Sequence, residues 1–178
     1  MRKFIILIMF VILLSACSSQ NSHKSFESVI ELEDVKFEVS NYELKSSNNP
    51  NDKDVQTFHK NALYYRFTLL NTGVEKIGSE KIDDEKLEVY IEAHDHLFAF
   101  MEPNRFGNNK SNMWRASGSQ QAFLNPNDKG EYFLTYIIAD NQDLDNVTEN
   151  ALKADIVVLL VTASGESKEI KRFNLTND

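Results

Sequence analysis

Cysteine is nearly absent from this chain, which has 178 residues and a single cysteine, Cys17. One thiol cannot form an intramolecular disulfide, and a zinc site built from thiolates needs several of them. The folded part of the chain must therefore be stabilised by the packing of its apolar side chains, which make up 42% of the sequence.

Motifs of the common catalytic sites are also missing. The sequence has no Gly-x-Ser-x-Gly elbow, no glycine-rich phosphate loop and no His-Glu-x-x-His pair. Its acidic residues are scattered through loops and through the outer faces of the expected strands. We therefore expect a protein that is not an enzyme and that carries no cofactor.

Positive charge is in deficit. The chain has 19 Lys and Arg against 27 Asp and Glu, which gives a formal net charge of −8. This balance disfavours binding to nucleic acid, and it disfavours a polybasic attachment to anionic lipid headgroups.

The N-terminus has the pattern of an export signal. Residues 1–3 include two basic side chains, residues 4–14 are all apolar, and residues 14–17 read Leu-Ser-Ala-Cys. The apolar run is too short for a membrane-spanning helix, which needs about 20 residues. The segment resembles a bacterial lipoprotein signal with its lipobox. An ordinary cleaved signal, or an uncleaved anchor with an incidental cysteine, is the alternative interpretation.

The resemblance to lipoproteins assigns a fate to Cys17. In that family the thiol receives a diacylglyceryl group and the chain is cut before the cysteine, so residues 1–16 would be removed. Two acyl chains anchor durably, because each buried methylene contributes about 0.8 kcal/mol. Residues 17–29 would then be the lipidated cysteine and a polar tether, and residues 30–178 a domain on the extracytoplasmic face of the cell membrane.

The rest of the chain predicts strands. Apolar and polar residues alternate, or apolar residues form a short run, in residues 31–44, 62–70, 87–93, 97–101, 131–139, 156–162 and 168–175. Turn signals separate these segments, and no long stretch has the helical period. The sequence therefore predicts an all-β antiparallel sandwich of about seven to eight strands. We expect residues 87–93 and 97–101 to form a hairpin, and residues 140–154 to include one helical turn.

One strand carries a family resemblance. Residues 64–73, Tyr-Tyr-Arg-Phe-Thr-Leu-Leu-Asn-Thr-Gly, form an alternating strand that ends in Asn-x-Gly. This strand resembles one in the immunoglobulin-like domains of small Gram-positive lipoproteins in the DUF4352 and DUF5067 groups. The resemblance extends over residues 35–175 and implies an immunoglobulin-like sandwich on a lipid anchor. It implies no catalytic residues. Gly73 is expected at a turn position with positive φ.

Two polar segments raise the question of a metal site. His94 and His96 lie two residues apart, and on a strand both imidazoles would face one side and could share zinc or copper. Because the hairpin turn is expected here, we favour a solvated turn and predict no metal. Residues 140–146 are acidic, but Asp145 and Ala151 replace the Gly and Glu that an EF-hand loop requires. We favour a polar loop that caps a helical turn.

The long segment of residues 102–121 holds the candidate partner contacts, Phe106, Met113 and Trp114. Large apolar side chains in a polar loop either cover the sandwich as a lid or remain exposed as anchors for a partner. The expected partner is another envelope protein or a cell-wall component. A receptor for a small ligand or a metal ion, using His94 and His96, is the alternative function.

Overall fold

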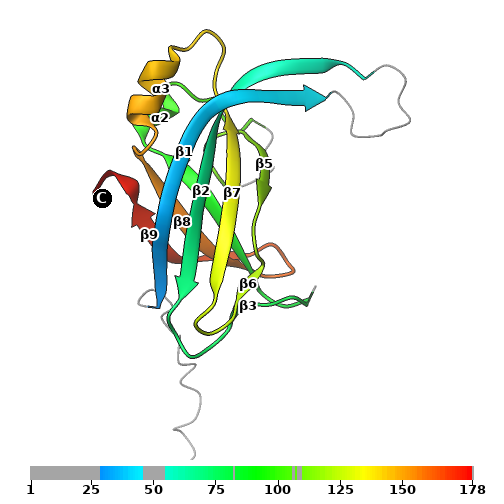
Figure 1. Ribbon diagram of the computed structural model, residues 1–178. Coiled ribbons are helices and arrows are strands. Elements are labelled where there is room, and N and C mark those ends of the chain that lie inside the picture. The colour runs from blue at the N-terminus through cyan, green and yellow to red at the C-terminus, as the bar shows by residue number, and fades with distance from the viewer. Residues whose placement is uncertain (1–28, 46–54, 82, 106, 108–109, 178) are drawn as a thin grey trace, which may run out of the picture.

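The computed structural model describes residues 29–45, 55–81, 83–105, 107 and 110–177. The predicted signal, the tether, Cys17 and Phe106 lie outside these residues. The described part of the chain is an antiparallel β-sandwich, so the predicted all-β class is confirmed (Figure 1). Two of the nine strands in this part are only two residues long, and the other seven form the two main sheets.

The two main sheets pack face to face. One has the order β1-β2-β7-β5 and the other the order β4-β8-β9. The strands are β1 (Ile30–Lys45), β2 (Thr57–Asn71), β3 (Ile77–Gly78), β4 (Lys86–Ala93), β5 (Arg115–Ser119), β6 (Phe123–Leu124), β7 (Lys129–Ile137), β8 (Ala154–Val161) and β9 (Ser167–Asn174). The helices are α2 (Asp95–Phe98) and α3 (Leu144–Asn150), and the chain ends in the short 3-10 helix η1 (Leu175–Asn177).

Alternate side chains of β2 and β7 fill the core between the sheets. Tyr65 and Phe67 on β2 are buried, as are Tyr132 and Tyr136 on β7. The rings of Phe67 and Tyr132 are stacked with centroids 5.4 Å apart, while those of Tyr65 and Tyr136 meet edge to face at 6.2 Å. Since these residues point inward, their neighbours in the sequence form the outer face of the same sheet.

The Asn-x-Gly motif closes the end of β2. Asn71 is fully buried, and its Nδ2 donates hydrogen bonds to the carbonyls of Glu75 (2.7 Å) and Asn125 (3.1 Å). The N–H of Gly73 donates to Asn71 Oδ1 at 3.0 Å. Gly73 does not have the positive φ that we predicted. A Cβ there would lie 3.1 Å from the side chains of both Asn71 and Val29, a close contact that these side chains would have to relieve by shifting.

The predicted hairpin after β4 is wrong. β4 pairs with β8, and the residues that follow β4 form α2 in place of a strand. Leu97 and Met101 are both buried in the core. Leu97 lies within α2, whereas Met101 follows it and forms an isolated bridge with Ile138, so the chain passes to the end of β7 and does not return along β4. The helical turn expected in residues 140–154 is confirmed as α3.

Side chains cover the free edge of β4. The N–H of Val89 donates to Gln120 Oε1 (3.0 Å), and the N–H of Ala93 donates to Asn112 Oδ1 (3.0 Å). Between them, the N–H of Ile91 donates to the hydroxyl of Tyr136 at 2.8 Å. Uncovered edge strands pair readily with other chains. Residues 111–122 therefore close this side of the sandwich without adding a full strand.

β1 and β2 continue past the sandwich as a two-stranded arm, made of residues 41–45 and 57–61. β7 pairs with β2 only along residues 62–70, so the arm has no third strand. Figure 1 shows the arm bending away from the rest of its sheet, at the end of the molecule opposite the start of β1.

Candidate functional site

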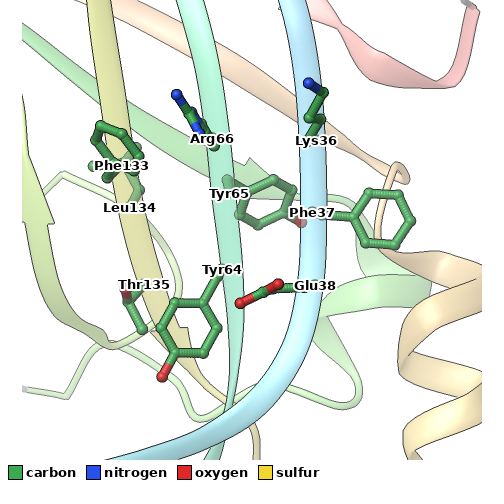
Figure 2. A pocket seen from close by; sticks show the side chains of 9 residues that line it. All are labelled: Lys36, Phe37, Glu38, Tyr64, Tyr65, Arg66, Phe133, Leu134 and Thr135. Atoms are coloured by element: carbon green, nitrogen blue, oxygen red, sulfur yellow. The ribbon is translucent and has the colours of Figure 1, made fainter.

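A groove lies on the outer face of the β1-β2-β7-β5 sheet. It has a volume of about 350 Å³, and nine residues of β1, β2 and β7 line it. The side chains on the outer face are those of Lys36, Glu38, Tyr64, Arg66, Phe133 and Thr135, which Figure 2 shows gathered over the three strands. We call this feature the sheet groove. Its residues are separated in the sequence and are brought together by the strand pairing.

The register places the groove residues in two rows across the sheet. In the first, Lys36 pairs with Arg66, and Arg66 pairs with Phe133. We call these three residues the cationic row.

The second row lies two residues along each strand. Glu38 pairs with Tyr64, and Tyr64 pairs with Thr135. We call these residues the polar row. Because each strand repeats at two residues, the rows are about 6.6 Å apart. The groove is thus cationic and aromatic at one end and polar, with a single carboxylate, at the other.

Arg66 is held over the ring of Phe133. Its guanidinium carbon lies 5.1 Å from the ring centroid, within the range of a cation–π contact. One nitrogen of Arg66 also lies 3.4 Å from Glu131 Oε2, and both side chains are more than half exposed. Contacts of this length and exposure contribute little energy. The aromatic ring therefore orients the guanidinium while most of its N–H donors stay accessible.

Tyr64 forms the wall of the groove next to the arm. Its hydroxyl donates a hydrogen bond to the carbonyl of Asn41 at 2.9 Å, and its ring lies 6.4 Å from that of Tyr42. Burial raises the pKa of Tyr64, and the neighbouring Tyr42 and Glu38 raise it further. The phenol is therefore neutral at physiological pH and fixes the point where the sheet bends into the arm.

The structure does not bring His94 and His96 together as metal ligands. His94 precedes α2 and His96 lies within it, so the two-residue spacing of a strand does not apply. His94 Nε2 lies 2.9 Å from Asp155 Oδ1, whose other oxygen accepts from Arg172 at 2.9 Å. His94 is thus part of a polar network with Asp155 and Arg172 and not of a solvated turn. The described residues contain no group of three or more potential metal ligands.

Arg172 is the centre of that network. Its guanidinium contacts the carboxylates of Glu92 and Asp155 and makes two hydrogen bonds to Glu169, at 2.8 and 3.0 Å. These contacts raise the pKa of Arg172, and the hydrogen bond to Arg172 lowers that of Glu169. The network links the three strands of the β4-β8-β9 sheet through Glu92, Asp155 and Arg172.

The predicted contact loop is built into the sandwich. Met113 is completely buried in the core, so the prediction that it contacts a partner is wrong. The cause is a bridge between Pro103 and Met113, which folds residues 110–114 back against residues 102–105 and makes Met113 part of the lid that we expected as the alternative. Trp114 is half-buried, and its N–H donates to the carbonyl of Glu102 at 2.8 Å.

The acidic segment 140–146 supports α3, as expected. Asp143 caps the helix by accepting from the N–H of Asp145 at 3.0 Å. Asp140 pairs with Lys60 at 2.6 Å. Both carboxylates therefore have structural partners.

Sequence reasoning missed the sheet groove. The outward positions of each strand could be assigned from the alternation, but the sequence does not tell which strands are neighbours. The available signal was Phe133, a large apolar residue at a position that the alternation of β7 assigns to the outer face; the structure shows it exposed between two buried residues.

Comparison with family models, with curated proteins and with solved structures finds no match to this chain. None of the helices in the described part has the length and apolar character needed to cross a membrane.

Proposed function

We propose that this chain is a non-enzymatic, lipid-anchored lipoprotein of the bacterial cell surface, and that its domain binds a component of the envelope through the sheet groove. Two features support the proposal. The N-terminal pattern ending in Cys17 is typical of lipidated proteins. The groove is a concave site that combines aromatic, cationic and acidic side chains.

The composition of the groove carries the proposal. Tyr and Arg are enriched where proteins bind their partners, and Phe is enriched with them. Only three large apolar side chains of the described residues are strongly exposed, and one of them is Phe133, at 41%. A second, Phe58, is on the arm at a position that continues the same face of β2. Two of the three therefore lie on one face.

The lining residues favour binding over catalysis. They include one carboxylate, Glu38, and no His or Cys. General acid–base hydrolysis commonly needs two carboxylates, and nucleophilic catalysis needs an activated side chain. The groove therefore supplies contacts for recognition.

The position of the groove suits a tethered domain. β1 starts at Ile30, directly after the predicted tether, and Lys36 lies six residues further on. At about 3.3 Å per residue, the groove is about 20 Å from the start of the strand. The arm lies beyond it (Figure 1). A component of the envelope would therefore bind on the outer face of the sheet, between the tethered end of the domain and the arm.

A receptor for a small ligand is the second candidate function. The volume of about 350 Å³ falls within the range of small-molecule sites, about 300–1,000 Å³. The metal-binding version of this alternative has no support in the groove, whose lining includes a single potential ligand of the carboxylate or imidazole type.

Photo-crosslinking in living cells tests the binding site. A crosslinking residue is placed at Ser119, which pairs with Phe133 at the rim of the groove, or at Lys168 on β9 as a control. We expect a discrete adduct from position 119, none from position 168, and loss of the adduct when Arg66→Ala and Phe133→Ala are combined. Equal adducts from both positions would refute the groove as the binding site.

Membrane attachment is tested separately. We expect the full chain to incorporate labelled palmitate and to sediment with membranes, and the Cys17→Ser variant to do neither. Sedimentation of that variant without label would favour an uncleaved anchor.

A further inference from the structure

We infer that the sheet groove binds a small, soluble, phosphorylated molecule, with its phosphate group between Lys36 and Arg66. This inference rests on the second candidate function of the groove, a receptor for a small ligand, and names the chemistry of that ligand. It is carried by the positive charges of Lys36 and Arg66, by their weak pairing with acidic side chains, and by the size of the groove.

The two cations lie in an arrangement that favours an anion. Lys36 and Arg66 are directly opposite each other on adjacent strands and point to the same face. Like charges in such cross-strand pairs repel each other and destabilise a sheet. No acidic side chain of the described residues forms an ion pair with Lys36. An anion bound between the two cations would remove this repulsion.

Comparison of Arg66 with Arg172 shows that Arg66 has few contacts with carboxylates. Arg172 contacts three carboxylates, and its side chain is 36% exposed. Arg66 has one contact with Glu131, at 3.4 Å, and is 57% exposed. The fork of N–H donors on Arg66 is nevertheless oriented by Phe133. An oriented, accessible guanidinium is suited to an oxyanion.

A phosphate fits this pair better than a carboxylate. A planar carboxylate is satisfied by the guanidinium fork alone, whereas a tetrahedral phosphate has further oxygens for the ammonium of Lys36. A phosphomonoester carries a charge of about −1.5 to −2 at pH 7, which matches the two cations.

The remaining groove indicates the rest of the ligand. Glu38 lies one row away, about 6.6 Å along the strand, and can accept hydrogen bonds from a hydroxyl or amino group of the ligand. Tyr64 and Phe133 form walls for its carbon skeleton. The volume of about 350 Å³ limits the ligand to a small molecule.

Binding of glycerol 3-phosphate to the full chain in detergent micelles tests this inference. The readout is broadening of the ligand's phosphorus-31 NMR signal at about 0.15 M salt, where distant charges are screened. We expect the wild type to bind glycerol 3-phosphate, inorganic phosphate to compete for the site, and glycerol not to compete. The combined Lys36→Gln and Arg66→Gln variant should bind about tenfold more weakly or worse, since it loses the charge-assisted hydrogen bonds of both cations.

A charge-matched control isolates the site. The combined Lys45→Gln and Lys168→Gln variant loses the same charge outside the groove and should bind within about twofold of the wild type. An equal loss in both variants, or no broadening with the wild type, would overturn the inference. If vesicles with anionic phospholipid headgroups compete as strongly as phosphate does, the claim that the ligand is a soluble molecule is wrong. If the crosslink from position 119 persists while phosphate binding is absent, only the ligand class fails.

Discussion

Replacement of three core tyrosines by phenylalanine, one at a time, tests how the sandwich uses buried hydroxyl groups. Tyr65, Tyr132 and Tyr136 are all fully buried, and each substitution removes one oxygen atom from a similar apolar environment. Their hydrogen bonding differs. The hydroxyl of Tyr65 donates to the carbonyl of Ala151 at 2.6 Å, and that of Tyr136 accepts from the N–H of Ile91 at 2.8 Å. The hydroxyl of Tyr132 has no hydrogen-bond partner among the described residues.

These differences predict opposite signs. Tyr65→Phe leaves a buried carbonyl without its donor, and Tyr136→Phe leaves a buried N–H without its acceptor. Each should lower the free energy of unfolding by about 1–3 kcal/mol. Tyr132→Phe removes a hydroxyl that is desolvated without compensation, which costs the folded state about 1–3 kcal/mol. The variant also loses the van der Waals contacts of the hydroxyl oxygen, which offsets part of this gain. We expect Tyr132→Phe to be more stable than the wild type by about 1 kcal/mol.

Urea unfolding, followed by far-UV circular dichroism, measures the three changes. The midpoint should fall for Tyr65→Phe and Tyr136→Phe and rise for Tyr132→Phe, with unchanged slope. In thermal unfolding, about 1 kcal/mol corresponds to about 2–4 °C for a domain of this size. A loss of 1 kcal/mol or more for Tyr132→Phe would refute the reasoning, because it would show that this hydroxyl is satisfied in the folded protein.

Three further predictions concern Asn71 and the ionisable groups. Asn71→Ala should lower the free energy of unfolding by about 2–4 kcal/mol, because buried carbonyls and the N–H of Gly73 lose their partner; urea midpoints measure this loss. The hydrogen bond to Arg172 lowers the pKa of Glu169 in the folded state. This bond therefore contributes its full stability above the ordinary glutamate pKa, and the contribution is lost as the pH falls through the lowered pKa of the folded state. The urea midpoint should therefore fall less between pH 7 and pH 3 in Glu169→Gln than in the wild type, and an identical fall would contradict the prediction. Burial raises the pKa of Tyr136 to about 12, so its contribution is complete below pH 10 and is lost as the pH rises toward 12. Absorbance at 295 nm should show this phenol ionising together with the loss of the far-UV signal, and ionisation of all tyrosines near pH 10 with the fold intact would refute it.

The strands with strict alternation could be predicted from the sequence because one face of each is buried. The part of β2 from Leu63 to Asn71 is the clearest case, since its odd-numbered residues are buried and its even-numbered ones lie on the outer face. Residues 97–101 show the limit of such reasoning. Their composition suits a strand, but Leu97 is buried from the helical turn α2 and Met101 from a bridge to Ile138, so the segment does not pair with β4.

The candidate site could not be predicted because it depends on which strands are neighbours. Arg66 and Phe133 are 67 positions apart in the sequence and come into cation–π contact only through the β2–β7 register. Met113 was misassigned for a similar reason. A polar segment suggests exposure, and only the bridge to Pro103 returns this side chain to the core.

The course of β1 has a mechanical consequence. The strand runs from Ile30 past the sheet groove and into the arm, and it is paired with β2 along nearly its whole length. If the chain is anchored through Cys17 and the groove holds an envelope component, a pull on that component loads β1 along its own axis. The hydrogen bonds to β2 then share the force in shear, whereas a pull across the strand would break them one after another. The domain should therefore withstand tension between the membrane and its bound partner.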